Sequence, residues 1–223
     1  MIGNLNKECI CEELVIIGAG GFGREVLWLI DEINEKQKRW KVVGFIDENK
    51  SLHDKYINGK IVLGGFEYLK LNKNVKYVCA IGNADIRKNI VKSYCSDLTA
   101  ATLIHPKIKI SEFNKIGEGA IICSGTILTV NINIGSHSII NLDCTIGHDV
   151  VMEEFVTVYP GCNISGNVLL ESGCEIGTGT QIIQGKTVGK NSIIGAGSVV
   201  VRDIAKNKVA VGIPAKEIRN ISH

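Results

Sequence analysis

An apolar side chain recurs at every sixth residue through the C-terminal half of the chain, without interruption. The positions are Ile116, Ile122, Leu128, Ile134, Ile140, Ile146, Met152, Val158, Ile164, Leu170, Ile176, Ile182, Val188, Ile194 and Val200. A second series, four residues after the first, is mostly small or β-branched, with Lys186 as the exception. A six-residue period fits neither an α-helix nor an alternating strand. It is typical of a solenoid of very short strands, in which each repeat buries its apolar side chain by stacking on its neighbours.

The composition agrees with a thin aliphatic core. Apolar residues make up 45% of the 223 residues and aromatic residues only 5%. The formal charge of +2 argues against a nucleic-acid-binding or polybasic membrane surface. We expect no membrane span because no long apolar run occurs, and no signal peptide because residues 1–13 lack the required pattern. The sequence therefore predicts a cytoplasmic protein.

The cysteines predict buried thiols rather than disulfides. The chain has eight cysteines, and the only close pair is Cys9-Glu-Cys11. Cys144, Cys162 and Cys174 fall in the small-residue series of the repeat. Small buried hydrophobic residues in a reducing compartment are the simplest interpretation of this pattern.

The first hundred residues follow a different pattern, in which strands alternate with helices. We expect strands at residues 14–17, 41–47 and 77–81, and helices at residues 24–38 and 84–95, the second with Asn83 as its N-cap. This order predicts a small parallel sheet covered by helices, a Rossmann-like half domain. We place an α/β domain at residues 1–103 and the repeat domain at residues 104–223.

A glycine run between the first strand and the first helix predicts a ligand site. Gly18, Gly20 and Gly23 match G-x-G-x-x-G, where backbone N–H groups at a helix N-terminus bind a pyrophosphate. The candidate substrate-binding residues are Gly18, Gly20, Gly21, Gly23, Asp47 and Asn83. Asn83 and Arg24 are the weaker candidates. A mononucleotide or sugar nucleotide is the favoured ligand, because about 80 residues form at most half of a dinucleotide fold. A dinucleotide site, or a glycine turn needed only for packing, stays open.

Several segments together resemble one enzyme family. They are Gly18-Ala-Gly-Gly-Phe-Gly-Arg-Glu25, Val43–Asp47, Ala80–Arg87, the hexads, and Val211–Lys216. This combination is similar to the sialic acid O-acetyltransferase and nucleotide-amino-sugar N-acetyltransferase family, which includes bacillosamine and perosamine N-acetyltransferases. The resemblance implies a left-handed parallel β-helix, an exception to the right-handed crossover rule. It also implies a homotrimer with active sites between subunits, acetyl-CoA bound along the β-helix, and a sugar substrate near the N-terminal domain.

The repeat geometry brings a histidine next to a glycine. Three hexads make one triangular coil, so residues eighteen apart stack at about 4.8 Å. Gly166 then lies directly above or below His148, which Asp149 follows in the same turn. Acyl transfer needs a base for the proton of the nucleophile and a donor for the oxyanion. The resemblance implies that His148 is the general base, that Asp149 orients it, and that the Gly166 N–H contacts the acetyl carbonyl.

The acetyl-CoA contacts rest on the resemblance alone. The candidate residues are Asn141, Thr157, Gly166, Lys190, Ala196 and Lys216. Many relatives carry a second histidine where this chain has Thr157, and the threonine keeps only a hydroxyl for hydrogen bonding. For Asn141, an asparagine ladder that caps a turn is an equally good interpretation.

The remaining histidines do not predict a metal site. The repeat region holds only His137 and His148, without the third ligand that a catalytic zinc site needs. His105 precedes Pro106 at the domain junction, which favours a structural role, and His137 is either exposed or interfacial.

The sequence thus predicts an acetyl-CoA-dependent enzyme that N-acetylates a nucleotide-linked amino sugar, in a pathway of glycan biosynthesis. One alternative is O-acetylation of sialic acid or a related sugar. Another is a non-catalytic scaffold that binds sugar nucleotides.

Overall fold

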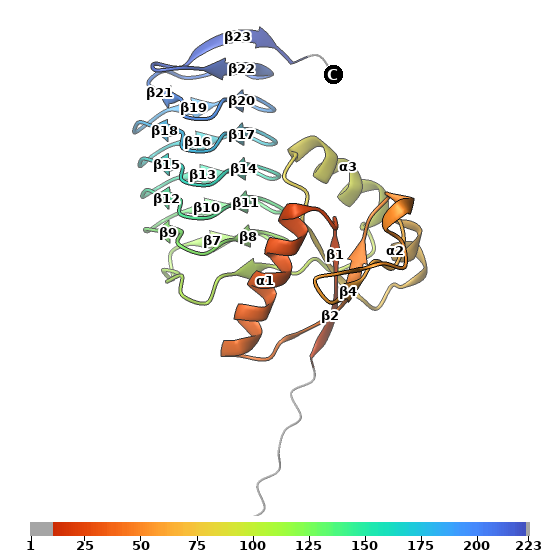
Figure 1. Ribbon diagram of the computed structural model, residues 1–223. Coiled ribbons are helices and arrows are strands. Elements are labelled where there is room, and N and C mark those ends of the chain that lie inside the picture. The colour runs from red at the N-terminus through yellow and green to blue at the C-terminus, as the bar shows by residue number, and fades with distance from the viewer. Residues whose placement is uncertain (1–10, 222–223) are drawn as a thin grey trace, which may run out of the picture.

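A computed structural model describes residues 11–221 as a small α/β part packed against a three-sided solenoid (Figure 1). The absence of a signal peptide predicted for residues 1–13 falls mostly outside these residues. No helix between residues 11 and 221 combines the length and the apolar character needed to cross a bilayer.

The α/β part is built on a short parallel sheet. Its elements are β1 (Glu12–Ile17), α1 (Gly21–Lys36), β2 (Trp40–Ile46), a 3-10 turn (Lys50–Leu52), β3 (Tyr56–Ile57), β4 (Lys60–Ile61), α2 (Glu67–Leu71), β5 (Lys76–Cys79) and α3 (Ala84–Tyr94). The parallel sheet has the order β2-β1-β5, and the last four residues of the central strand β1 are completely buried. Helix α1 begins at Gly21, inside the glycine run, and not at Arg24 as the periodicity indicated. Glycine has no side chain to cap or pack there, so the sequence pattern could not locate that first turn.

The solenoid has three faces, each a stack of parallel two-residue strands, to which the long face adds the longer strands β22 and β23 at its C-terminal end. The β7 face contains β7 (Lys115–Ile116), β10 (Asn133–Ile134), β13 (Val151–Met152), β16 (Leu169–Leu170) and β19 (Thr187–Val188). The long face contains β6 (Leu103–Ile104), β8 (Ile121–Ile122), β11 (Ile139–Ile140), β14 (Thr157–Val158), β17 (Glu175–Ile176), β20 (Ile193–Ile194), β22 (Lys208–Val211) and β23 (Lys216–Asn220). The β9 face contains β9 (Ile127–Leu128), β12 (Thr145–Ile146), β15 (Asn163–Ile164), β18 (Gln181–Ile182) and β21 (Val199–Val200).

The six-residue period produces this architecture directly. From β6 to β21 the paired strands lie eighteen residues apart, as in the pairing of Ile146 with Ile164. The recurring apolar residues therefore stack inside the prism, and nearly all of them are buried. Cys144, Cys162 and Cys174 lie in the same interior with no exposed surface, as predicted.

In most turns between faces, the third of the four residues that join consecutive strands lies in the left-handed backbone region, at a φ near +60°. Glycine, asparagine and aspartate occupy most of these positions because they tolerate this region best. His137 (φ 56°) and Phe155 (φ 60°) are the exceptions in the solenoid. Their rings stack on each other with centroids 5.1 Å apart, and His137 also stacks on Tyr77 of β5 at 6.1 Å. These two bulky turn residues therefore form part of the contact between the α/β part and the solenoid.

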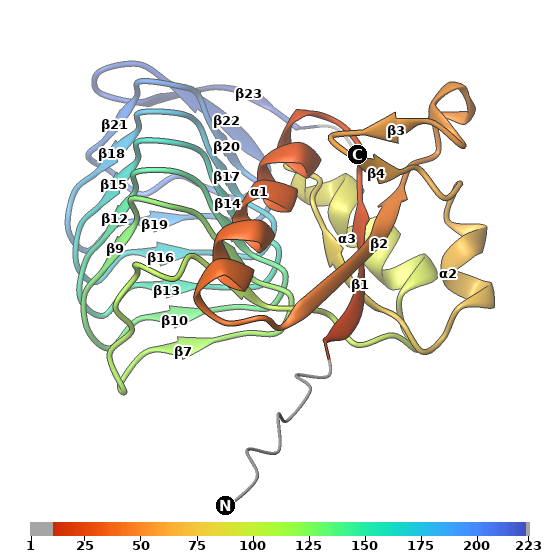
Figure 2. The same ribbon diagram turned by 60° about the horizontal axis from the view of Figure 1, so that its bottom comes forward.

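The α/β part covers the first coils of the long face, with α1 between its sheet and the solenoid (Figure 2). Helix α3 packs against the other face of the sheet, and its first residue, Ala84, contacts the solenoid. The outward side chains Leu103, Ile121 and Ile139 are at most 1% exposed and share one apolar cluster with residues of α1. At the other end, β23 pairs antiparallel with β22 and extends the long face beyond the last coil. This pairing occupies an edge that would otherwise be open.

Candidate active site

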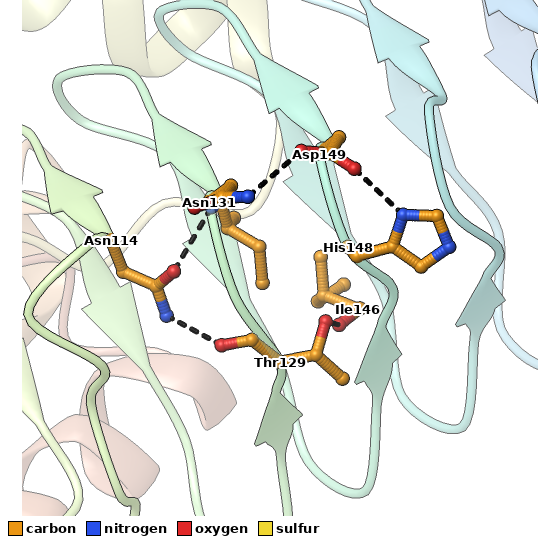
Figure 3. Close-up of polar contacts among 7 residues, drawn as sticks. Asn114, Thr129, Asn131, Ile146, His148 and Asp149 are labelled. Atoms are coloured by element: carbon orange, nitrogen blue, oxygen red, sulfur yellow. Dashed lines mark hydrogen bonds and ion pairs between the residues drawn. The ribbon is translucent and has the colours of Figure 1, made fainter.

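The His148–Asp149 pair occupies the turn between the β9 face and the β7 face, directly after β12. Asp149 has φ 61°, a value that aspartate tolerates. His148 Nδ1 lies 2.8 Å from Asp149 Oδ2, and both side chains are about half exposed (Figure 3). Hydrogen bonds from His148 and then from Asn131 hold the pKa of Asp149 below its ordinary value. Because the ionised carboxylate accepts the Nδ1 proton, the Nε2 lone pair of the neutral imidazole is available.

Gly166 lies against the His148 ring, at the position that the eighteen-residue stacking predicted. A Cβ atom on Gly166 would lie 2.5 Å from both Cε1 and Nε2 of the ring. The next residue, Asn167, donates its N–H to the His148 carbonyl oxygen at 2.8 Å. A glycine is therefore required for the imidazole to occupy this place.

The Gly166 N–H has no acceptor within residues 11–221. Elsewhere in the solenoid the equivalent N–H can be satisfied by a side chain one coil earlier, as where Ser172 N–H donates to Glu153 Oε2 at 2.8 Å. Gly147 occupies the position equivalent to Glu153, and a Cβ there would lie 2.6 Å from Gly166 N. Glycines at 147 and 166 thus leave a backbone donor open beside the imidazole.

A groove of about 280 Å³ runs along the β9 face and ends beside this turn. Its walls include Thr145, Gly147, Asn163 and Ser165. Ile127, also in the wall, is 59% exposed. The groove therefore offers an open, partly apolar track that leads to the His148–Gly166 pair.

Packing and backbone conformation require glycine at two positions of the glycine loop, Gly18 and Gly23, but not at Gly20 and Gly21. Gly18 has φ 100°, and a Cβ on Gly23 would collide with the Gly18 carbonyl oxygen. By contrast, a Cβ on Gly20 would have no neighbour within 4 Å, and one on Gly21 only Arg24 at 3.9 Å. Packing thus explains Gly18 and Gly23 but leaves Gly20 and Gly21 unexplained. Gly20 precedes α1 and provides no side-chain cap, so the helix N-terminus is open to an anion.

Asp47 joins the glycine loop to the segment after β2. Its Oδ2 accepts the Ala19 N–H and its Oδ1 accepts the Asn49 N–H, both at 2.9 Å. The carboxylate also lines a pocket of about 180 Å³ together with Gly18, Phe66 and Ile86. Each carboxylate oxygen can accept a further hydrogen bond, so the structural role leaves room for a ligand contact.

Asn83 lies at the N-terminus of α3 and caps it, as predicted, because its side-chain oxygen accepts the Ile86 N–H at 2.9 Å. The loop before Asn83 is held by a buried arginine, Arg87, which the sequence analysis did not predict as a functional residue. Arg87 is 1% exposed and donates Nη1 to the carbonyl oxygens of Ile81 and Gly82 at 2.6 and 2.9 Å. Burial lowers its pKa to about 10, so it stays protonated at neutral pH.

Arg87 also reaches the solenoid, where it meets Thr157. Its Nη2 donates to Thr157 Oγ1 at 2.9 Å and to the Phe155 carbonyl at 2.8 Å, while its Nε donates to the His137 carbonyl at 2.8 Å. Thr157 in turn donates its hydroxyl to the Gly82 carbonyl at 2.7 Å. The threonine that replaces the usual histidine is 1% exposed and ties the two parts of the chain together.

A second buried link runs beside the first. Glu175 Oε1 accepts the Ala84 N–H at the start of α3 at 2.9 Å, and its Oε2 accepts the Tyr159 hydroxyl at 3.0 Å. Burial, and then the charge of Glu175, raise the pKa of Tyr159 to about 12. The residues that fix α3 to the solenoid are thus distributed over two coils. The sequence had singled out Thr157 and the segment that contains Arg87, but neither Tyr159 nor Glu175.

The other residues predicted to contact acetyl-CoA lie on different edges of the prism from His148. Asn141 follows β11, and Ala196 lies in the turn between the long face and the β9 face. Lys190 lies in the turn between the β7 face and the long face, and Lys216 begins β23. A single chain therefore does not bring these residues to the His148 turn.

Neither of the other described solenoid-side histidines belongs to this site. His105 is 2% exposed and lies 3.3 Å from Glu32 of α1, a structural contact between the two parts. His137 is interfacial, and burial lowers its pKa. Within residues 11–221 no three histidine, cysteine or acidic side chains are arranged to hold a metal ion, and the cysteines are free thiols.

Comparisons with known proteins agree with this architecture. Residues 13–94 match the PglD N-terminal domain family. The chain is 32% identical over 185 residues to GDP-perosamine N-acetyltransferase of Escherichia coli O157:H7, covering 82% of each protein. The chain belongs to the perosamine and bacillosamine N-acetyltransferase family. This membership confirms the predicted acetyl-CoA-dependent acyltransferase of sugars, with acetyl-CoA as its co-substrate.

Two solved structures show the same fold. A mutant of perosamine N-acetyltransferase from Caulobacter crescentus, in complex with CoA and GDP-perosamine, superposes with a TM-score of 0.83 at 25% identity, covering 93% of this chain and 97% of that one. The acetyltransferase domain of PglB from Neisseria gonorrhoeae FA1090, in complex with acetyl coenzyme A, gives a TM-score of 0.83 at 28% identity, covering 93% and 100%. The predicted fold, an α/β domain followed by a left-handed β-helix, is confirmed. The division at residues 103 and 104 stays a prediction.

Proposed function

We propose that this family member transfers the acetyl group of acetyl-CoA to the amino group of a nucleotide-linked amino sugar, at the turn that carries His148. The observation that carries the proposal is the juxtaposition of an imidazole with a free Nε2 and the open N–H of Gly166. A base and an oxyanion donor are the two groups that acyl transfer requires. A non-catalytic scaffold would need neither the base nor the oxyanion donor.

In the proposed reaction the neutral amine attacks the thioester carbonyl carbon while Nε2 of His148 takes a proton from the nitrogen. The developing oxyanion accepts a hydrogen bond from the Gly166 N–H. When the C–S bond breaks, the proton on His148 passes to the departing sulfur, which leaves as the thiol of coenzyme A. Asp149 stabilises the intervening imidazolium and keeps Nδ1 protonated. The proton that leaves the amine therefore ends on the sulfur of coenzyme A, and no other titrating group is needed.

We further propose that the glycine loop and Asp47 bind the nucleotide. Gly20 and Gly21 are the glycines that packing does not require, so the backbone there is free to approach a pyrophosphate at the N-terminus of α1. The adjacent pocket combines the Asp47 carboxylate with apolar walls, which suits a ribose or base. The relatives' nucleotide sugars, GDP-perosamine among them, fit this class of ligand.

The distribution of the predicted contacts supports a homotrimer. His148 and Ala196 lie on different edges of one prism, and neighbouring copies packed side by side would bring unlike edges together. Sedimentation equilibrium tests this, with three times the 24.2 kDa chain mass expected. A cytoplasmic location and a role in glycan biosynthesis complete the proposal, because acetyl-CoA and nucleotide sugars are cytoplasmic substrates.

The release of coenzyme A thiol tests the function directly. Acetyl-CoA is mixed with GDP-, UDP- and dTDP-linked 4-amino sugars and, separately, with free sialic acid. Turnover with an amino sugar that falls by about 10²-fold or more in His148→Ala supports the proposal. Turnover with sialic acid alone would instead establish O-acetylation, and no turnover with any acceptor would favour the scaffold.

A further inference from the structure

Asp149 is held from both sides, by His148 on one oxygen and by Asn131 on the other. Asn131 Nδ2 donates to Asp149 Oδ1 at 3.1 Å, while His148 Nδ1 lies 2.8 Å from Oδ2. Asn131 lies one coil earlier in the same stack, eighteen residues away (Figure 3). With both oxygens engaged, the plane of an otherwise half-exposed carboxylate is defined.

Asn131 is itself fixed by the coil beneath it. Asn114 donates Nδ2 to the Thr129 carbonyl at 2.9 Å and accepts the Ile132 N–H on its Oδ1 at 3.0 Å. These bonds clamp the turn on both sides of Asn131, whose φ is 58°. The Thr129 hydroxyl then donates to the Ile146 carbonyl at 3.2 Å, on the strand that leads to His148.

We propose that Asn131 is a positioning residue that acts through Asp149 to orient the His148 imidazole toward Gly166. This inference rests on the proposed function, since it assigns Asn131 a part in preparing the same base. A general base must point its free nitrogen at the nucleophile, and an exposed imidazole with a freely rotating partner samples many directions. In an asparagine ladder the side chain of a turn asparagine would only bond backbone groups. Here the side chain of Asn131 fixes the rotation of the Asp149 carboxylate.

Asn167 provides a matched control. It lies in the same stack on the far side of Asp149, with a φ of 57°. Its side-chain amide, unlike its backbone N–H, makes no hydrogen bond to His148 or Asp149 in the described part of the chain. Glycine suits this backbone conformation, so Asn131→Gly and Asn167→Gly each remove an amide without straining the turn. Asn131→Asp keeps the shape but replaces the donor by a second carboxylate.

The test is a double-mutant cycle on steady-state kinetics. Asn131→Gly is expected to lower kcat about threefold to tenfold at unchanged KM for acetyl-CoA, and Asn131→Asp at least as much. Asn167→Gly is expected to keep the wild-type kcat. In an Asp149→Ala background Asn131→Gly should cause no further loss, because its route to His148 has been removed. An equal loss in that background, or a loss in Asn167→Gly as large as in Asn131→Gly, overturns the inference.

A titration separates failure of this inference from failure of the proposed function. Carbon-13 NMR of the Asp149 carboxyl group does not require turnover. Loss of the Asn131 donor removes a hydrogen bond to the ionised form, so the pKa of Asp149 should rise in Asn131→Gly and stay unchanged in Asn167→Gly. Unchanged pKa values in both variants refute the contact. A shift without any acetyl transfer refutes only the assigned reaction.

Discussion

Replacing Gly166 by alanine should disable the site while leaving the fold intact. The new Cβ would lie 2.5 Å from Cε1 and Nε2 of His148. An ordinary van der Waals contact begins near 3.4 Å, so the half-exposed ring must move by about 1 Å. A displacement of that size in a catalytic group costs on the order of 10²-fold in rate, or roughly 2.7 kcal/mol of activation free energy. Because the φ of Gly166 lies outside the left-handed region, alanine should not strain the backbone.

The assay measures kcat by coenzyme A release and the melting temperature by circular dichroism. Gly185→Ala serves as the opposite control, since a Cβ there meets nothing within 4 Å but φ is 69°. It should lose about 1–2 kcal/mol of unfolding free energy and keep its kcat. A Gly166→Ala enzyme with full activity would refute the placement of the imidazole over Gly166.

Three further predictions concern buried polar groups and thiols. Arg87→Met should lower the free energy of unfolding by roughly 2–3 kcal/mol in urea titrations, because buried carbonyl oxygens lose their donor, whereas the exposed Lys92→Met on the same helix should change little. The folded protein holds the pKa of Tyr159 near 12, above the value of about 10 expected when unfolded, so stability should fall as pH rises from 10 to 12. Tyr159→Phe should flatten that fall, and an unchanged slope would contradict the burial of the hydroxyl. Burial raises the pKa of Cys79 and Cys123 to about 12, so at pH 8 iodoacetamide should label them only after unfolding, while the half-exposed Cys11 serves as the reactive reference.

The regular half of the fold follows from the sequence because its period is also its pairing rule. Once three hexads make a coil, the strand partners from β6 to β21 are fixed, and the stacking of Gly166 on His148 follows by counting. Asn131 obeys the same rule, since it lies eighteen residues before Asp149. What counting cannot tell is whether a turn asparagine bonds its own backbone or a neighbouring side chain, since that depends on rotamers.

The contact between the two parts of the chain could not be predicted in this way. Thr157 lies in a repeat position whose outward direction is evident, but the partner it meets is Arg87, seventy residues away, across a domain interface. Arg87 lies outside the six-residue repeat, so the repeat cannot predict its contact with Thr157. The predicted roles of Thr157, Asn141, Lys190, Ala196 and Lys216 beside acetyl-CoA stay predictions, because within one chain these residues do not lie at the His148 turn.

The identity of the product tests the central claim most directly. Acetyl-CoA labelled with carbon-13 in its carbonyl group would be incubated with the accepted nucleotide-linked 4-amino sugar, and the product examined by NMR. We predict the carbonyl signal of an amide bonded to the sugar nitrogen in the wild-type reaction, and a much slower appearance of the same signal with His148→Ala. An ester carbonyl, or an amide formed equally fast without His148, would contradict the account.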